Sequence, residues 1–386
     1  MTATAPPRGW STEPAGQPVG VGIIGAGNVS GQYLPSLLSY PDLAVRGIAD
    51  LDAQRARDQA DSYGIAFAGS PGELLALDGV ELIVNLTVPA AHAEVALAAI
   101  ETGHHVWGEK PLTDGRASAR AVLDAARAAG VLVGNAPDTI LGAGIQRSQR
   151  LLADGAIGEP GTVLTLMQGP GPERWHPRPQ FLFQRGAGPL FDIGPYYLTT
   201  LVQLLGPIAS VSAAGHRARA ERVIGTGPDA GVAFAVDVDT HISVVTRFRS
   251  GVVGTSVYSF DSPVSRQQFE ITGDGGTMQV PVSGFNGPTL ILRSGSDDGW
   301  EEMPAGGEDR DRGVGVLEMA RAIGEGRAPR ASGQLAYHVL DVMLAIEESV
   351  SRGEPVEIDS TADPVLPLEA DWSATRSTCA SKGMQP

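Results

Sequence analysis

Cysteine, positive charge and long apolar segments are all scarce in this 386-residue chain. Its one cysteine, Cys379, excludes an intrachain disulfide and is compatible with a reducing compartment. No segment approaches the roughly 18 apolar residues that cross a membrane, and residues 1–18 lack the apolar centre of a signal peptide. We therefore expect a cytoplasmic protein whose first 18 residues form a disordered arm.

Basic residues are outnumbered, because 28 Lys and Arg stand against 44 Asp and Glu and give a formal net charge of −16. A surface of this sign repels nucleic-acid phosphates and anionic lipid headgroups, so we expect no nucleic acid and no membrane as a partner. The histidines form no group with Asp, Glu or Cys at metal-ligand spacing, and the sequence has no P-loop lysine and no G-x-S-x-G string. We therefore predict no metal site.

Short apolar runs alternate with helical patterns from Val19 to about Gly134, as in VGVGIIG (19–25) and ELIVNL (81–86). Apolar residues make up 42% of the chain, which is enough for real hydrophobic cores. Nearly continuous apolar strands that alternate with helices predict a parallel sheet covered on both faces. We assign residues 19–136 to a Rossmann domain with a doubly wound sheet.

The pattern changes after about Pro137. Runs of alternating polarity with glycine-rich turns fill residues 209–293, which is typical of antiparallel strands. Helices are predicted before and after these runs, including one from about Gly194 to Leu205. We assign residues 137–368 to an α/β domain with an open, mostly antiparallel sheet, and residues 369–386 to a flexible tail.

The first candidate site is the turn GAGNVS (25–30), between the first strand and the first helix. Gly25 permits a tight turn, and Gly27 lets the backbone approach a pyrophosphate at the helix N-terminus. Ser30 replaces the third glycine of the dinucleotide fingerprint, so the match is imperfect. Asp50 ends the second strand, where a carboxylate binds ribose hydroxyls and repels a 2′-phosphate, which favours NAD over NADP. The cofactor contacts expected here are Gly25, Gly27, Asn28, Val29 and Asp50.

The second candidate site is Glu109-Lys110-Pro111, which follows a strand and precedes a helix. Ligands of doubly wound sheets bind beyond the carboxyl ends of the strands, so a lysine here points toward the nicotinamide. Pro111 fixes the local backbone and with it the direction of Lys110. We expect Lys110 to be catalytic. Further cofactor contacts are expected at the neighbouring strand ends, from Leu86, Thr87, His92, Glu109 and Lys110.

Four segments resemble the Gfo/Idh/MocA oxidoreductases, which include glucose–fructose oxidoreductase and inositol dehydrogenases. They are GIIGAGNVSG (22–31), NLTVPAAHAEVALAAIETGHHVWGEKPL (85–112), LLADGAIGEPG (151–161) and GPLFDIGPYYL (188–198). The resemblance spans about residues 19–351 and implies a Rossmann domain followed by an α/β domain with an open sheet. In this family the open sheet packs against a partner subunit, so the resemblance also implies a homodimer or homotetramer.

The resemblance further implies two catalytic residues in the second domain. The family commonly carries Asp-x-Gly-x-His, in which the aspartate and the histidine face the substrate and the histidine is the acid/base. This chain has DIGPY at 192–196, so Asp192 matches and Tyr196 stands where the histidine usually is. Some members, glucose–fructose oxidoreductase among them, look similar in using tyrosine there. A tyrosine beside a lysine ammonium can move a proton near neutrality.

The loop PERWHPRPQF (172–181) is a candidate substrate surface. Trp175 and His176 offer a flat apolar face and a polar edge, which suit a sugar ring. His176 could also replace the missing histidine, so the sequence leaves open whether Tyr196 or His176 carries the proton. Asp138 and Thr139 follow the last Rossmann strand and are expected to face the substrate.

Together these features predict an NAD-dependent dehydrogenase that acts on CH–OH groups of a sugar, a sugar derivative or an inositol-like polyol. Two alternatives stay open. The chain could hydrolyse, cleave or isomerise a sugar by an internal redox cycle around tightly bound NAD, as some family members look to do. It could also be a non-enzymatic, ligand-sensing regulator that kept the fold.

Overall fold

The computed structural model describes residues 17–282 and 284–378, which form two compact units. Among these residues, unit 1 contains the chain up to Leu141, the segment Gly307–Tyr337 and the chain from Leu368 onward, and unit 2 contains Gly142–Gly306 and His338–Pro367. The predicted domains, 19–136 and 137–368, do not include this return of the chain to unit 1. Cys379 and most of the predicted N-terminal arm lie outside the described residues.

Unit 1 is built on a six-stranded parallel sheet with the strand order β3-β2-β1-β4-β5-β6. The strands are β1 (Val19–Ile24), β2 (Leu43–Ala49), β3 (Phe67–Gly69), β4 (Leu82–Asn85), β5 (His105–Gly108) and β6 (Val133–Asn135). All residues of β4 and β5 are buried, which explains why these strands are apolar throughout. The predicted doubly wound Rossmann sheet is confirmed.

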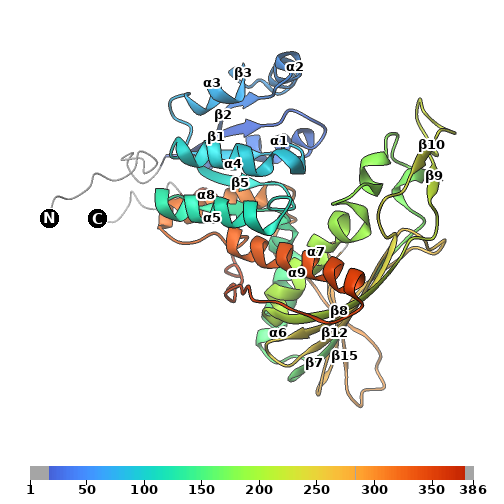
Figure 1. The fold of residues 1–386 in the computed structure, drawn as a ribbon. Helices are drawn as coiled ribbons and strands as arrows, with labels where there is room; N and C mark the ends of the chain where they lie inside the picture. Colours follow the sequence, from blue (N-terminus) through green and yellow to red (C-terminus); the bar gives the residue numbers. More distant parts are fainter. Residues whose placement is uncertain (1–16, 283, 379–386) are drawn as a thin grey trace, which may run out of the picture. The chain divides into compact units, whose positions relative to one another are not determined.

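Helices cover both faces of this sheet. They are α1 (Ser30–Ser39), α2 (Ala53–Tyr63), α3 (Pro71–Leu75), α4 (His92–Glu101), α5 (Arg116–Ala129) and α8 (Val314–Glu325), with the 3₁₀ turns η1 (Pro89–Ala91) and η2 (Asp138–Leu141). The chain leaves β1 toward one edge and β4 toward the other, and right-handed crossovers then place the following helices on opposite faces. Accordingly α4 packs on α5, as Figure 1 shows, while α1 packs on α8. Ligands of such sheets bind where the direction reverses, here between β1 and β4.

The described part of the predicted flexible tail, residues 369–378, makes specific contacts inside unit 1. The ring of Trp372 contacts two guanidinium groups, with Cζ of Arg310 at 4.9 Å and Cζ of Arg321 at 4.7 Å from its centroid. The buried carboxylate of Asp42 accepts hydrogen bonds from Nε of Arg321 at 2.8 Å and from the N–H of Thr378 at 3.1 Å. The polar composition of this segment gives no sign of these partners, which are distant in the sequence.

Unit 2 contains a nine-stranded sheet with the order β16-β15-β14-β13-β7-β12-β11-β8-β17. The strands are β7 (Pro160–Gln168), β8 (Ile208–His216), β11 (His241–Phe248), β12 (Val253–Ser259), β13 (Arg266–Gly273), β14 (Gly276–Gln279), β15 (Thr289–Arg293), β16 (Glu301–Met303) and β17 (Val356–Glu357). Strands β7 and β12 pair in parallel, and the other neighbours in this sheet pair antiparallel. The predicted open, mostly antiparallel sheet is confirmed.

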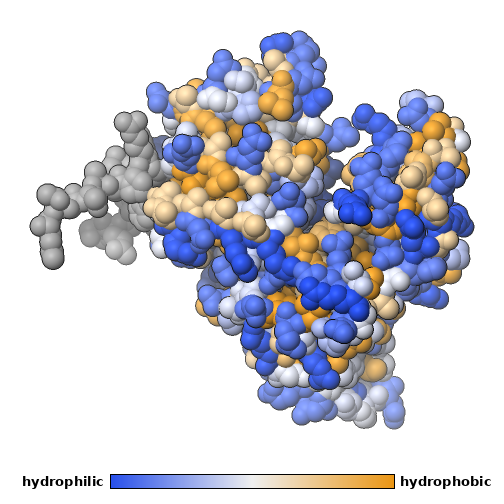
Figure 2. All heavy atoms as spheres, viewed as in Figure 1, coloured by the Kyte–Doolittle hydropathy of each residue, from blue (hydrophilic) through white to orange (hydrophobic). Residues whose placement is uncertain are grey.

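One face of this sheet carries helices. They are α6 (Ala143–Ala153), α7 (Gly188–Leu205) and, from His338 onward, α9 (Gly333–Arg352), and α7 packs on β7, β11 and β12. Two further 3₁₀ turns, η3 (Pro172–Arg174) and η4 (Gln180–Phe183), lie between β7 and α7. Between β8 and β11 the chain forms a separate hairpin of β9 (Glu221–Val223) and β10 (Ala233–Ala235). Figure 2 shows hydrophobic side chains on its surface, where Val223 and Val232 are exposed.

Helix α7 begins at Gly188, earlier than the predicted start near Gly194. Proline is favoured in the first turn of a helix, and Pro189 occupies it. Pro195 lies inside the helix, where proline normally acts as a breaker, so the sequence pattern placed the start too late. The earlier start puts the whole Asp192–Tyr196 motif within the helix. Among the described residues, no helix is both long and apolar enough to span a membrane.

Candidate active site

The glycine-rich turn has the backbone shape that a dinucleotide needs. Gly25 has a φ of +109°, which residues with a side chain rarely adopt. A Cβ at this position would lie 2.7 Å from the backbone of buried Leu86. A Cβ on Gly27 would meet no described atom within 4 Å, so the backbone is open on that side. No side chain of the described residues caps α1, whose cap residue is Val29, and its first turn holds no acid. Its N-terminal amides therefore suit an anion such as a pyrophosphate.

Two polar side chains fix this turn from either end. The buried hydroxyl of Ser30 donates to the carbonyl oxygen of Gly27 at 2.7 Å, so serine replaces the third glycine without leaving an unpaired group. The Oδ2 of Asp50 accepts the N–H of Ala26 at 2.8 Å, and Nη1 of Arg55 lies 3.4 Å from its Oδ1. Asp50 thus stands at the carboxyl end of β2, next to the turn, as predicted from its spacing.

His92 links the turn after β4 to the Glu-Lys-Pro segment. It is buried, its Nδ1 lies 2.7 Å from the carbonyl oxygen of Pro111, and its Nε2 lies 3.1 Å from that of Thr87. Nδ2 of Asn85 donates to the carbonyl oxygen of His92 at 3.1 Å, and the hydroxyl of Thr87 donates to Oδ1 of Asn85 at 2.6 Å. The Lys110–Pro111 peptide bond is cis. Two predicted site residues, Thr87 and His92, therefore belong with Asn85 and Pro111 to one connected network at the carboxyl ends of β4 and β5.

Glu109 is the centre of a second network, which holds the main chain of Lys110. Its Oε2 accepts the N–H of Lys110 at 3.0 Å, and its Oε1 accepts the hydroxyl of Tyr33 at 2.6 Å and lies 3.6 Å from Nη1 of Arg312. Burial, with the charge of Glu109, raises the pKa of Tyr33 well above its usual value, so this hydroxyl stays protonated and donates. The sequence did not identify Tyr33, which has the spacing of a core residue, or Arg312, which lies in a distant segment.

Asp138 and Thr139, predicted to face the substrate, are both buried in η2. Oδ2 of Asp138 accepts the N–H of Gly313 at 2.7 Å and the N–H of Gly315 at 3.2 Å. Burial raises the pKa of Asp138 to about 6. The carboxyl group therefore holds the start of α8 against η2, and a contact with substrate stays a prediction.

In unit 2, Asp192 and Tyr196 lie four residues apart in α7, so their side chains leave the helix on the same face. Both are partly exposed. The next residue, Tyr197, points into the core, where its hydroxyl donates to the carbonyl oxygen of Leu166 at 3.3 Å and burial raises its pKa. Of the two adjacent tyrosines, only Tyr196 is partly exposed, and its contact with a ligand stays a prediction.

The aromatic loop presents a cluster of rings at its surface. His176 lies between Trp175 and Phe181, with ring centroids 5.6 and 5.4 Å away, and Trp175 is 68% exposed. Nδ1 of His176 accepts the N–H of Arg178 at 3.0 Å. An accepting ring nitrogen carries no hydrogen, so the neutral imidazole has its hydrogen on Nε2 and can donate from there.

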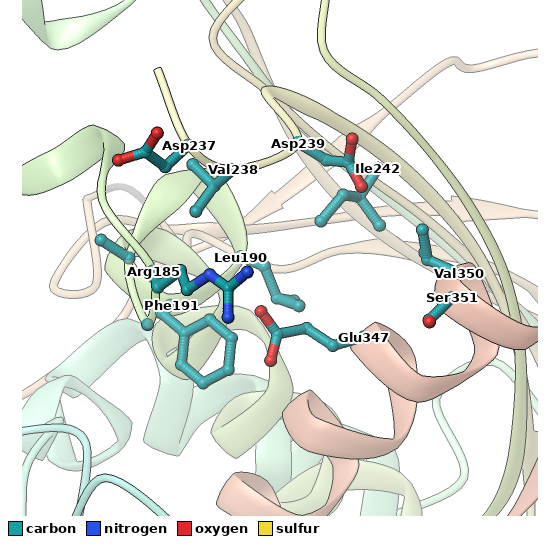
Figure 3. A pocket seen from close by; sticks show the side chains of 12 residues that line it. Arg185, Leu190, Phe191, Asp237, Val238, Asp239, Ile242, Glu347, Val350 and Ser351 are labelled. Atoms are coloured by element: carbon teal, nitrogen blue, oxygen red, sulfur yellow. The ribbon is translucent and has the colours of Figure 1, made fainter. Parts of the chain in front are cut away.

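A cavity of about 480 Å³ opens in unit 2 beside the first turn of α7 (Figure 3). Figure 3 shows charged and apolar side chains around it, among them Arg185, Leu190, Phe191, Asp239 and Glu347. Leu190 and Phe191 directly precede Asp192, but none of the predicted site residues lines this cavity. In residues 17–282 and 284–378, no group of three or more His, Cys, Asp or Glu side chains is arranged to hold a metal ion.

Two family models match the chain. The model of an oxidoreductase family with an NAD-binding Rossmann fold matches residues 19–136. The model of a GFO/IDH/MocA C-terminal domain matches residues 145–279. The two matches fall on the parallel sheet of unit 1 and on α6, α7 and much of the large sheet of unit 2.

Several known proteins are similar to this chain. A dTDP-3,4-didehydro-2,6-dideoxy-alpha-D-glucose 3-reductase of Streptomyces antibioticus is 30% identical over 206 residues, which are 52% of this chain and 60% of that protein. A D-xylose 1-dehydrogenase (NADP(+)) of Haloferax volcanii is 26% identical over 341 residues, which are 88% of this chain and 99% of that protein. The solved structure of levoglucosan dehydrogenase in complex with NADH and L-sorbose shares the fold, with a TM-score of 0.78 at 22% identity, and the match covers 89% of this chain and 100% of that chain.

Proposed function

The chain belongs to the Gfo/Idh/MocA oxidoreductases, and we propose that it transfers a hydride between a nicotinamide dinucleotide and a CH–OH or carbonyl carbon of a sugar, a sugar derivative or an inositol-like polyol. One observation carries this proposal. The open glycine-rich turn, Asp50 and the Glu109–Lys110 pair all lie at the carboxyl ends of strands of the same parallel sheet, after β1, β2 and β5. The names of the relatives, which act on a deoxyglucose nucleotide, xylose and levoglucosan, support a sugar-like substrate.

The residues of unit 1 fit a nicotinamide dinucleotide, which supplies or accepts the hydride when it is bound. Gly25, Gly27 and the amides of α1 would hold the pyrophosphate, and Asp50 would hold the adenosine ribose. We assign NAD rather than NADP. Arg55 is already paired with Asp50 and Asp52, so these three charges sum to −1 and would repel a 2′-phosphate.

Lys110 acts on the reacting oxygen of the substrate. Its ammonium group stabilises negative charge on this oxygen while the C–H bond is broken or formed. Glu109 accepts the N–H of Lys110, and Tyr33 in turn holds Glu109. The main chain from which the lysine extends is therefore fixed before substrate arrives, which lowers the cost of reorganisation during the reaction.

Tyr196 carries the proton, and His176 donates a hydrogen bond to the substrate. Nδ1 of His176 already accepts the N–H of Arg178, so Nε2 is the ring nitrogen left to contact a ligand. The remaining Nε2–H is a donor, which suits a sugar hydroxyl and does not suit a base. Tyr196 shares its helix face with Asp192, whose carboxylate orients the tyrosine or a substrate hydroxyl.

The open face of the unit 2 sheet is the surface that we assign to self-association. Leu166 of β7 and Val257 of β12 are paired neighbours on this face, and Val245 of β11 alternates with buried Val244 and is 46% exposed. Apolar side chains that are left on an open sheet face are typical of a subunit interface. We therefore propose a homodimer or homotetramer, which works in the cytoplasm, where NAD is available.

The proposal is tested by releasing any bound nucleotide with acid, identifying it by mass, and then screening aldoses, anhydrosugars and inositols for reduction of NAD and NADP. We expect at least one of these compounds to reduce NAD, at a rate about tenfold or more above NADP. Cleavage or isomerisation of a sugar without net reduction of NAD or NADP would contradict the proposal and favour an internal redox cycle around bound NAD. Nucleotide binding without any turnover would favour a ligand-sensing protein.

A further inference from the structure

We infer that the β9–β10 hairpin holds the aromatic loop, residues 171–183, in its binding position through Arg222. Arg222 is then a positioning residue for the substrate rather than a catalytic one. This inference rests on the proposed function, in which His176 of the loop donates a hydrogen bond to the substrate.

Arg222 joins three separate segments of unit 2. It lies in β9, and its side chain is only 3% exposed. Its Nη1 donates to Oε1 of Glu173 in the loop at 2.6 Å and to the carbonyl oxygen of Phe260 at 3.2 Å. Its Nη2 donates to Oδ1 of Asp261, just after β12. Separating a buried guanidinium from its two carboxylate partners is costly, because it leaves a buried charge unpaired.

The beginning of the loop is fastened at Glu173. Besides the ion pair with Arg222, the carbonyl oxygen of Glu173 accepts the N–H of Gly225 at 2.8 Å. A Cβ on Gly225 would lie 3.0 Å from this oxygen, so the hairpin backbone lies directly against the loop. Gly171 has a φ of +97°, and a Cβ there would overlap both Glu173 and Arg222. Glycine at these two positions makes the close approach possible.

The end of the loop is fastened at Phe183. Cζ of Arg222 lies 5.0 Å from the centroid of this ring, and the ring of Phe234 in β10 lies 5.3 Å away. The carbonyl oxygen of Phe183 accepts the N–H of Asp237 at 2.9 Å. Arg222 therefore contacts both anchors of the loop at once, from the hairpin side.

The aromatic cluster lies between these anchors and depends on them. Trp175 and Phe181 are 68% and 55% exposed, so they have little packing of their own to hold them. A loop released from its anchors would have to be ordered by the substrate, and this ordering weakens binding. The cofactor residues lie in unit 1, so we expect cofactor affinity to be unaffected.

Two glycines between β9 and β10 provide a matched pair of variants. Gly227 and Gly231 have φ values of +83° and +91°, so alanine strains the backbone similarly at both. A Cβ on Gly227 would lie 2.6 Å from Cβ of Pro177 in the loop, whereas a Cβ on Gly231 would meet no described atom within 4 Å. Gly227→Ala therefore pushes against the loop, and Gly231→Ala is its control.

Wild type and both variants are compared by substrate KM and kcat, by NAD affinity, and by the rate of trypsin cleavage after exposed Arg174 in the native protein. We expect Gly227→Ala to raise KM about tenfold, with NAD affinity within about twofold, and to speed cleavage several-fold. Gly231→Ala should match wild type. An equal KM in the two variants overturns the inference, whatever the cleavage rate. If no compound turns over, the proposed function fails independently of this inference. The rate of trypsin cleavage then tests whether the hairpin holds the loop. Equal cleavage rates in Gly227→Ala and Gly231→Ala would overturn the inference.

Arg222 itself is tested without leaving a buried charge unpaired. The triple variant Arg222→Met, Glu173→Gln, Asp261→Asn removes the whole charge cluster, and Arg222→Lys keeps the charge but loses the forked geometry. We expect KM to rise in the triple variant at least as much as in Gly227→Ala, and less in Arg222→Lys. A triple variant with the KM and the trypsin rate of wild type contradicts the role of Arg222.

Discussion

The hydroxyl of Tyr33 donates a 2.6 Å hydrogen bond to Oε1 of Glu109, whose other oxygen accepts the N–H of Lys110. A side chain of α1 therefore fixes the main chain of the proposed catalytic lysine. Both partners are buried, so water does not compete for this bond. Because the N-terminus of α1 also faces the expected pyrophosphate site, one helix serves both the cofactor and the lysine.

Tyr33→Phe removes this bond and leaves the Oε1 of Glu109 with the longer contact to Arg312. We expect kcat to fall about tenfold and the free energy of unfolding to fall by about 1–3 kcal/mol, because a buried acceptor loses its donor. Steady-state kinetics and urea unfolding measure the two effects. Tyr258→Phe is the control, since the Tyr258 hydroxyl is buried without a hydrogen-bond partner among the described residues. An unchanged kcat in Tyr33→Phe would show that Glu109 holds Lys110 without help.

Lys110→Met should lower kcat by about three powers of ten, because the developing charge on the substrate oxygen loses its donor. NAD affinity, measured by fluorescence titration, should stay within a few-fold of wild type. The sequence contains two lysines, so Lys382→Met is the matched control for the loss of a lysine, and we expect it to behave as wild type. Wild-type turnover in Lys110→Met would remove the lysine from the mechanism.

Asp50→Ala should raise the KM for NAD by about tenfold and change the KM for NADP less, so that the preference between the two narrows. The change removes the proposed partner of the ribose and its hydrogen bond to the N–H of Ala26. Asp61→Ala is the control, because it removes an exposed carboxylate near the end of α2 that is not part of the cluster of Asp50, Asp52 and Arg55. A KM for NAD that stays the same in Asp50→Ala would contradict the assignment of Asp50.

Asp138 should make stability depend on pH. Its pKa is about 6 in the folded protein against an ordinary value of 3.8, so the folded state binds the proton more tightly. The free energy of unfolding therefore falls as pH rises from about 4 to 6, and above pH 6 the ionised carboxyl costs about 3 kcal/mol.

Asp138→Asn keeps an oxygen for the N–H groups of Gly313 and Gly315 but cannot ionise. We expect it to match wild type near pH 4 and to be more stable at pH 7, as measured by urea unfolding across this range. The difference between the two proteins cancels the other titrating groups. A variant less stable than wild type at pH 7 would mean that the carboxylate is favoured in the fold.

Val257→Asp should separate the subunits of the proposed oligomer, because it places a charge in the centre of the open sheet face. Light scattering after size-exclusion chromatography gives the mass of each protein. Leu366→Asp is the control, because Leu366 is an exposed apolar residue of unit 2 outside the strands of this sheet. If Val257→Asp and wild type have the same mass in solution, the subunit interface does not lie on this face of the sheet.

The fold could be predicted where the signal is local. The bounds of helix α5, Arg116–Ala129, can be read from the sequence, because glycines flank it on both sides and its residues favour helix. The parallel strands could be predicted because they are buried on both faces of the sheet and therefore form short apolar runs. The start of α7 was missed, since Pro195 reads as a helix breaker although the surrounding packing keeps it helical.

The candidate site could be predicted only as far as its motifs extend. Lys110 and Asp50 follow strands at fixed spacing, so their position follows from topology. Their partners do not, because Arg312 and Arg222 approach from segments far away in the sequence. The orientation of His176 depends on the N–H of Arg178, a contact that residue types alone do not indicate.

The most direct test of hydride transfer follows a deuterium atom. The sugar or polyol that turns over fastest in the screen is deuterated at the reacting CH–OH carbon and incubated with the protein and NAD. The reduced cofactor is then isolated, and its mass is measured by mass spectrometry. Direct transfer predicts that the NADH carries the deuterium. Wild type should form this labelled NADH far faster than Lys110→Met does. Unlabelled NADH, or a converted sugar with no NADH released, would contradict direct transfer to a dissociable cofactor.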